Sequence, residues 1–340
     1  MVLVRELGEH GLLQLLFQYC PASIVGDDAA LLAIAPSQSL VVTTDLLVDG
    51  VHFSIGHATP NLYTTSPADA GWRAAAANLS DLAAMGASPL GITVGLGLPG
   101  DLPVDVVEGF YIGMFNCLTL YGTPIVGGDV CRSPTLTVAI SALGQVEPVY
   151  AIRRSHAQPG DVIVATGVHG ASRAGLELLM NPERQGDLIA SEVQTLVQAH
   201  QRPRPRLDVI PDLHRAIAQT GADFRVAGMD SSDGLADAVL QICQASQVGA
   251  ILDRDRLPMP DCFSDWLSTE QALDWTLYGG EDFELVLCVP ESVAIALCAE
   301  QPDLFPIGHI TAEREIIVRD RAQVNPDIYL SEKKRFQHFS

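Results

Sequence analysis

The chain has 340 residues, is 48% hydrophobic and carries a formal net charge of −21 at pH 7. This length and apolar content suffice for two ordinary domains, each with a buried core. The negative charge argues against a nucleic-acid-binding surface and against a polybasic membrane anchor, because both are basic. Lysine occurs only at Lys333 and Lys334, so the chain lacks both the P-loop lysine and the strand lysine of protein kinases.

The first half of the chain alternates helical and extended patterns. Helical spacing covers residues 7–19, and a valine-rich strand is expected over 39–44, closed by Asp45. Ser66 and Pro67 are typical of an N-cap and a first helical position, and they open an alanine-rich helix that runs to Met85. The pattern then predicts a strand over 92–98, a helix over 104–121, a short strand over 124–126 and a strand over 135–146.

A stretch with two prolines and a glycine, residues 147–161, marks the expected domain boundary. We place domain one at residues 1–148 and domain two at 149–340. The second half predicts strands over 162–166 and 283–289 and a helix over 236–246, so the fold class is α/β or α+β. We find no signal-peptide layout, no bilayer-spanning apolar run and no C-x-x-C pair, and we therefore expect a cytoplasmic protein.

Carboxylates beside glycine, serine or threonine recur along the whole chain. The segments are Gly26-Asp27-Asp28, Thr43-Thr44-Asp45, Asn78-Leu79-Ser80-Asp81, Gly127-Gly128-Asp129, Asp230-Ser231-Ser232-Asp233-Gly234 and Gly279-Gly280-Glu281-Asp282. Each segment alone is also explained as a helix cap or a tight turn. Small residues let a ligand approach the backbone, and carboxylate and hydroxyl oxygens are hard ligands. Their recurrence without a lysine motif favours one site for divalent cations and, through them, for phosphates.

Some positions carry more information than others. Asp81 lies on an alanine-rich helix, where a carboxylate needs a partner, and Asn78 shares its helix face. The segment beginning at Asp230 opens a helix, whose N-terminus suits an anion. A lone histidine such as His52 is more often structural than a ligand, and Arg153 with Arg154 is either a solvated pair or a phosphate clamp.

In their order and residues, these segments closely resemble thiamine-monophosphate kinases. The resemblance runs from the first predicted helix to Phe339 and is most specific over residues 78–87 and 278–285. The wider superfamily includes aminoimidazole ribonucleotide synthetase, selenophosphate synthetase and a hydrogenase-maturation protein. The resemblance implies a two-domain aminoimidazole ribonucleotide synthetase-like fold, with an N-terminal sheet domain at the core of a homodimer and a C-terminal α/β domain that completes the active site.

The resemblance also implies an ATP-dependent kinase that converts thiamine monophosphate to thiamine diphosphate. The residues that would bind several magnesium ions are Asp27, Thr43, Thr44, Asp45, Asp81, Asp129, Asp230 and Asp233. Those that would contact ATP are Tyr111, Gly128, Asp129, Arg154 and Ser232, and those that would contact thiamine phosphate are His52, Glu281 and Phe336. No general base is expected, because the acceptor phosphate oxygen is already largely ionised near neutral pH.

Two places depart from the family pattern. Val130 and Cys131 stand where similar members usually have threonines, and Ser231 stands where they tend to have isoleucine. Neither departure removes a carboxylate, so the activity is not put in doubt.

Two other classes remain open: a superfamily synthetase or ligase acting on another substrate, and a metal- or nucleotide-binding protein without catalysis. The chain has no N-terminal lysine, which selenophosphate synthetase is expected to carry, and it ends in Ser340 where the hydrogenase-maturation protein is expected to have a reactive cysteine. Retention of every motif carboxylate argues against the second class.

Overall fold

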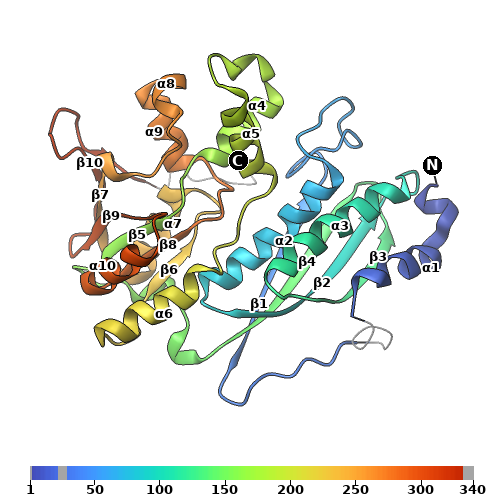
Figure 1. The fold of residues 1–340 in the computed structure, drawn as a ribbon, viewed down its shortest axis with the longest axis horizontal. Coiled ribbons are helices and arrows are strands. Elements are labelled where there is room, and N and C mark those ends of the chain that lie inside the picture. Colours follow the sequence, from blue (N-terminus) through green and yellow to red (C-terminus); the bar gives the residue numbers. More distant parts are fainter. Residues whose placement is uncertain (1, 22–28, 332–340) are drawn as a thin grey trace.

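The structure, a computed structural model, describes residues 2–21 and 29–331 and contains two β-sheets with helices packed against them (Figure 1). The first sheet has four strands in the order β1-β4-β2-β3, and the second has seven in the order β11-β10-β7-β9-β5-β8-β6. This is the two-domain α/β architecture expected from the sequence. The boundary placed after residue 148 lies between the two sheets and stays a prediction.

The elements of the first sheet and its helices are α1 (Val4–Leu16), β1 (Ser39–Val48), α2 (Pro67–Ala84), β2 (Ser88–Leu98), α3 (Val104–Leu120), β3 (Ile125–Arg132) and β4 (Thr137–Val146). Those of the second part are β5 (Val162–Thr166), α4 (Ala171–Met180), α5 (Ala190–Gln201), α6 (Val209–Thr220), β6 (Ala227–Asp230), α7 (Leu235–Ser246), β7 (Gly249–Asp253), α8 (Phe263–Trp266), α9 (Thr269–Tyr278), β8 (Leu285–Val289), α10 (Glu291–Glu300), β9 (Leu304–Thr311), β10 (Ile316–Arg319) and β11 (Ile328–Tyr329). No helix within these described ranges is long and apolar enough to cross a membrane.

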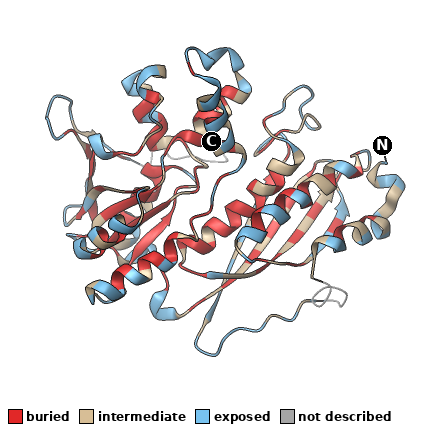
Figure 2. Cartoon of the chain, in the orientation of Figure 1, coloured by how far each residue is buried: buried red, intermediate tan, exposed pale blue. Residues whose placement is uncertain are grey.

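Helix α2 belongs to the first domain and also packs against the second. It begins as predicted, because the Ser66 side chain accepts a hydrogen bond from the Asp69 amide and Pro67 takes the first helical position. Its alanines are buried along nearly the whole length (Figure 2). The last turn, with Ala83 and Ala84, packs in a cluster with hydrophobic residues of α6 and β8. A side chain on α2 can therefore reach both domains.

Of the strands that extend further than the sequence pattern predicts, β1 and β3 carry predicted site residues. β1 continues through Asp45 and pairs with β4 along its full length, so Asp45 is not at a strand end. Gly127-Gly128-Asp129 lies inside β3 and pairs with β2, so neither a loop nor a turn forms there. At Gly128 a Cβ atom would clash with the carbonyl oxygen of Val94, which explains the glycine. Both errors arise because strand length depends on the pairing partner.

The four-stranded sheet has one covered face and one open face. Helices α2 and α3 pack side by side and cover the first (Figure 1). On β1 the alternate residues Leu40, Val42 and Leu46 are 47%, 58% and 53% exposed, and they share the other face. An apolar strip of this kind on the edge strand of a sheet is typical of a surface that another protein covers.

Candidate active site

A cluster of carboxylates lies where α2 meets the second domain. Asp45 comes from β1, Asp81 from α2, and Asp230 and Asp233 from the end of β6 and the turn before α7. Thr43 donates its hydroxyl to Asp81, and the Ser80 hydroxyl donates to Asp230 Oδ2 at 2.8 Å across the domain junction. These contacts bring together segments that are about 35 to 190 residues apart in sequence, which only the packing of α2 allows.

The carboxylates are close enough to change one another's ionisation. Burial, and then the charges of Asp81 and Asp233, raise the pKa of Asp45 to about 6. Burial, and then mainly the charge of Asp81, raise the pKa of Asp230 to about 7. Burial also raises the pKa of Asp81, against the lowering effects of the Thr43 hydroxyl and of Arg154. Arg154 therefore lies within electrostatic range of the same cluster.

This donor set suits a hard divalent cation such as magnesium. All the ligand atoms offered are carboxylate or hydroxyl oxygens, and the crowded negative charge is what a bound cation would relieve. In the described part of the chain, however, no three His, Cys, Asp or Glu side chains converge tightly enough to hold one ion. The residues fit magnesium by chemistry and charge, and the individual magnesium ligands stay predictions.

The segment 279–284 is joined to the segment that carries Asp230. The Ser231 amide donates to the carbonyl oxygen of Glu284 at 2.8 Å, and the Glu281 amide donates to that of Ser232 at 2.7 Å. A Cβ atom at Gly280 would lie 2.7 Å from the Ser232 carbonyl oxygen, so this close approach requires glycine. The predicted substrate residue Glu281 thus lies beside the predicted ATP residue Ser232.

His52 is oriented by the backbone of its own loop. The Val48 amide donates to His52 Nδ1 at 3.1 Å, so that nitrogen is an acceptor and the neutral ring carries its proton on Nε2. Asp49 is buried and accepts from the amides of Ile55 and Ala58, which holds the loop that carries the histidine. In this tautomer the donor of the ring is Nε2–H.

The remaining predicted residues do not join this cluster within one chain. The strand register places Asp45 level with Gly128, with β4 and β2 between them, so their backbones are about 14 Å apart. Asp129 is exposed and points to the opposite, open face of the sheet. Thr44 also faces this side, where its hydroxyl is 2.8 Å from the Ser141 hydroxyl. Tyr111 is buried and packs against the Tyr19 ring.

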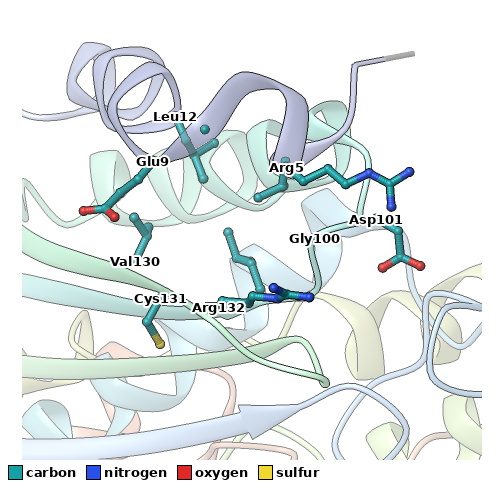
Figure 3. Close-up of a pocket in the computed structure, with 11 residues that line it drawn as sticks. Arg5, Glu9, Leu12, Gly100, Asp101, Val130, Cys131 and Arg132 are labelled. Carbon is teal, nitrogen blue, oxygen red and sulfur yellow. The ribbon is translucent and has the colours of Figure 1, made fainter.

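A pocket of about 510 Å³ adjoins the part of β3 that follows Asp129, between α1 and the ends of β2 and β3 (Figure 3). Its lining includes Arg5 and Glu9 from α1, Asp101, and Val130, Cys131 and Arg132, which follow Asp129 along β3. The predicted residues therefore do not form one group within the chain. The carboxylate cluster is at the domain junction, and Gly128 and Asp129 are on the far edge strand β3. Thr44 is on the open face of β1, and Tyr111 is buried on α3.

Two predicted residues, Asp27 and Phe336, lie outside the described residues, and their roles stay predictions. Sequence reasoning missed two others, Arg73 and His200, which contact Glu281 or lie next to it. For Arg73 a signal existed, because a charged residue interrupts the alanine run of α2. No local pattern pointed to His200.

Magnesium is expected to stabilise the protein more at pH 8 than at pH 5.5. In metal-free protein the pKa values of Asp45 and Asp230 are raised, so the folded state binds protons more tightly than the unfolded state. Their stabilising contribution is complete below about pH 4 and is lost as pH rises through 6 to 7. Thermal melts with EDTA and with magnesium at both pH values measure this, and an equal Tm gain at both would contradict it.

The family model for the AIR synthase related protein, N-terminal domain, matches residues 26–146, and that for the C-terminal domain matches residues 158–321. The thiamine-monophosphate kinase of Synechococcus elongatus is 50% identical, and the match covers 99% of this chain and 98% of the relative. The chain belongs to the thiamine-monophosphate kinase family. The family inferred from the sequence motifs is thereby confirmed.

Solved structures of thiamine-monophosphate kinases share the fold. That from Stenotrophomonas maltophilia K279a has a TM-score of 0.75 and 34% identity, covering 86% of this chain and 89% of its own. The structure of AaThiL complexed with AMPPCP and TMP has a TM-score of 0.70 and 29% identity, covering 97% and 99%. The two-domain AIR synthase-like fold predicted from the sequence is confirmed.

Proposed function

We propose that this protein is a thiamine-monophosphate kinase, which transfers the γ-phosphoryl group of ATP to thiamine monophosphate and forms thiamine diphosphate. The observation that carries this proposal is the convergence of Asp45, Asp81, Asp230 and Asp233 at the domain junction, in a chain that is 50% identical to the S. elongatus enzyme. Support for the two substrates comes from the related structure complexed with AMPPCP, an ATP analogue, and TMP.

The main obstacle to this reaction is repulsion between two anionic phosphates. The carboxylates of the cluster, with the Thr43 hydroxyl, would hold the magnesium ions, which supply positive charge to the transferring group. Arg154 adds a fixed positive charge at the same place, beside Asp81. His52 offers Nε2–H to a phosphate oxygen of the substrate. The chain needs no general base, because the acceptor oxygen is already ionised, and the transfer is direct and in line.

A second copy of this chain is the partner that we propose for the open sheet face. That face carries the exposed apolar residues Leu40, Val42 and Leu46, and also Asp129 at its far edge. When two such faces pack about a two-fold axis that runs along the strands, the far edge of one sheet lies near the first edge of the other. The Gly128-Asp129 group of one copy would then complete the carboxylate cluster of its partner.

The assay for this function combines purified protein, ATP, magnesium and thiamine monophosphate. We expect thiamine diphosphate and ADP in equal amounts, and no diphosphate when unphosphorylated thiamine replaces the monophosphate, because the acceptor must be a phosphate. EDTA is expected to stop the reaction. Binding of both substrates without any product would instead support a non-catalytic binding protein, and product from a different acceptor would support another enzyme of the superfamily.

A further inference from the structure

Arg73 is a buried charged residue on α2, the helix that packs against both domains. It lies two turns before Asp81 on α2, and only 3% of its surface is exposed. An arginine is not buried to this extent without partners, because removing its charge from water is costly. Its partners therefore indicate what it does.

Among the residues that the structure describes, the side-chain partners of Arg73 belong to the second domain. One end of the guanidinium, Nη2, forms an ion pair with Glu281. The other end, Nη1, donates to the His200 carbonyl oxygen at 3.1 Å and lies 2.8 Å from His200 Nε2. A planar guanidinium can make such contacts at once in fixed directions, which a lysine ammonium cannot. Arg73 thus holds the end of α5 and the segment with Glu281 against α2.

Further hydrogen bonds lead from His200 through Ser172 to Asp282, the residue after Glu281. His200 is buried, and burial together with Arg73 lowers its pKa, so the ring is neutral and can accept from the guanidinium. Its Nδ1 lies 3.0 Å from the hydroxyl of Ser172. Asp282 in turn accepts from the amides of Gly170 and Ser172, at 2.7 and 2.8 Å. Both neighbours in the chain, Glu281 and Asp282, are therefore tied to one network.

The backbone of this segment requires such support. Glu281 and Phe283 have φ values of +68° and +54°, which residues other than glycine rarely adopt. Conformations of this kind persist where neighbouring groups hold them, and they gather at ligand sites. Glu281 Oε2 lies 3.9 Å from His200 Nδ1, beyond hydrogen-bonding distance, and the Glu281 side chain is 36% exposed. One carboxylate oxygen is held by Arg73, and the other can be reached by a ligand.

We propose that Arg73 is a positioning residue, which fixes the Glu281 carboxylate so that its second oxygen receives the nitrogen-bearing, cationic part of the substrate. The inference rests on the proposed function, because thiamine monophosphate supplies a cationic thiazolium ring and an aminopyrimidine N–H. The negative Glu281 oxygen complements both groups. Arg73, on α2 of the first domain, acts through Glu281 and does not itself contact the substrate.

Steady-state kinetics test this role. Replacement of Arg73 by methionine is expected to raise KM for thiamine monophosphate about tenfold and KM for ATP less than about twofold. Glu281→Gln should have the same effect, and the double variant should be no worse than either single one, because both remove one interaction. Arg73→Lys should recover part of the loss, since it keeps the charge.

The matched control is Arg202→Met. Arg202 also joins the two domains through α2, where it pairs with Asp69 and lies over the Trp72 ring, but it does not contact Glu281. If Arg73 only held the domains together, Arg73→Met and Arg202→Met would change the KM values equally. We expect both KM values of Arg202→Met to stay within about twofold of the wild type.

Hydrogen exchange provides a measurement that needs no activity. The peptide over 278–285 should exchange faster in Arg73→Met, Arg73→Lys and Glu281→Gln than in the wild type and Arg202→Met. Wild-type exchange in the two Arg73 variants overturns the proposal, as does faster exchange with an unchanged KM for thiamine monophosphate. If the wild-type protein forms no thiamine diphosphate, the proposed function fails, and the exchange comparison alone decides whether Arg73 positions Glu281. Should Arg73→Met not fold, Arg73→Lys carries both measurements.

Discussion

Replacing Asp45 by asparagine is expected to lower kcat for thiamine diphosphate formation by about a hundredfold or more. Asparagine keeps the shape of the side chain but removes a negative charge from the centre of the cluster, where burial, and then the charges of Asp81 and Asp233, raise the pKa of Asp45. The proposed role of that charge is to hold magnesium against the transferring phosphoryl group. Steady-state assays at saturating ATP and magnesium measure the effect.

The fold of this variant should be unharmed. A raised pKa means that the ionised carboxylate is disfavoured in the metal-free protein, so a neutral side chain should leave its Tm unchanged or higher. The magnesium-dependent rise in Tm should shrink in the same variant. Asp187→Asn, at an exposed loop residue, is the control and should keep wild-type turnover. Near-wild-type turnover in purified Asp45→Asn would rule out the proposed role of the cluster.

A heterodimer of an Asp45→Asn chain and an Asp129→Asn chain is expected to regain about half of the wild-type activity, although each variant alone is nearly inactive. In one chain, Asp129 is on the opposite edge and the opposite face of the sheet from Asp45. When the site uses Asp45 from one copy and Asp129 from the other, a heterodimer contains one site with both changes and one with neither. The intact site accounts for the recovered half.

Co-expression of the two variants with different affinity tags, followed by two purification steps, isolates this heterodimer for assay. The control is a heterodimer of Asp45→Asn with Asp81→Asn, two residues of the same cluster. Each of its sites carries one change, so it should stay inactive. A pure Asp45/Asp129 heterodimer without recovered activity would mean that each site is complete within one chain. A monomer in solution would exclude the proposed partner.

Sequence reasoning identified the chemistry of the site better than its geometry. Asp81 was expected to need a partner because it lies on an alanine-rich helix, and the structure supplies Thr43 and, at longer range, Arg154. The start of α2 was likewise predictable, because the Ser66 cap and Pro67 act within a few residues. By contrast, Gly127-Gly128-Asp129 resembles a turn in sequence, and it lies in a strand because β2 pairs with it.

By itself, the sequence determined the class of ligand, the family and the local starts of helices, since these depend on residue type and on neighbours within a few positions. The tertiary structure alone decided which carboxylates meet. Strand pairing separates Asp129 from Asp45 across the sheet, and the packing of α2 between the domains brings Asp81 to Asp230 and Arg73 to Glu281. These contacts join residues up to about 200 positions apart, and no local preference encodes such pairings.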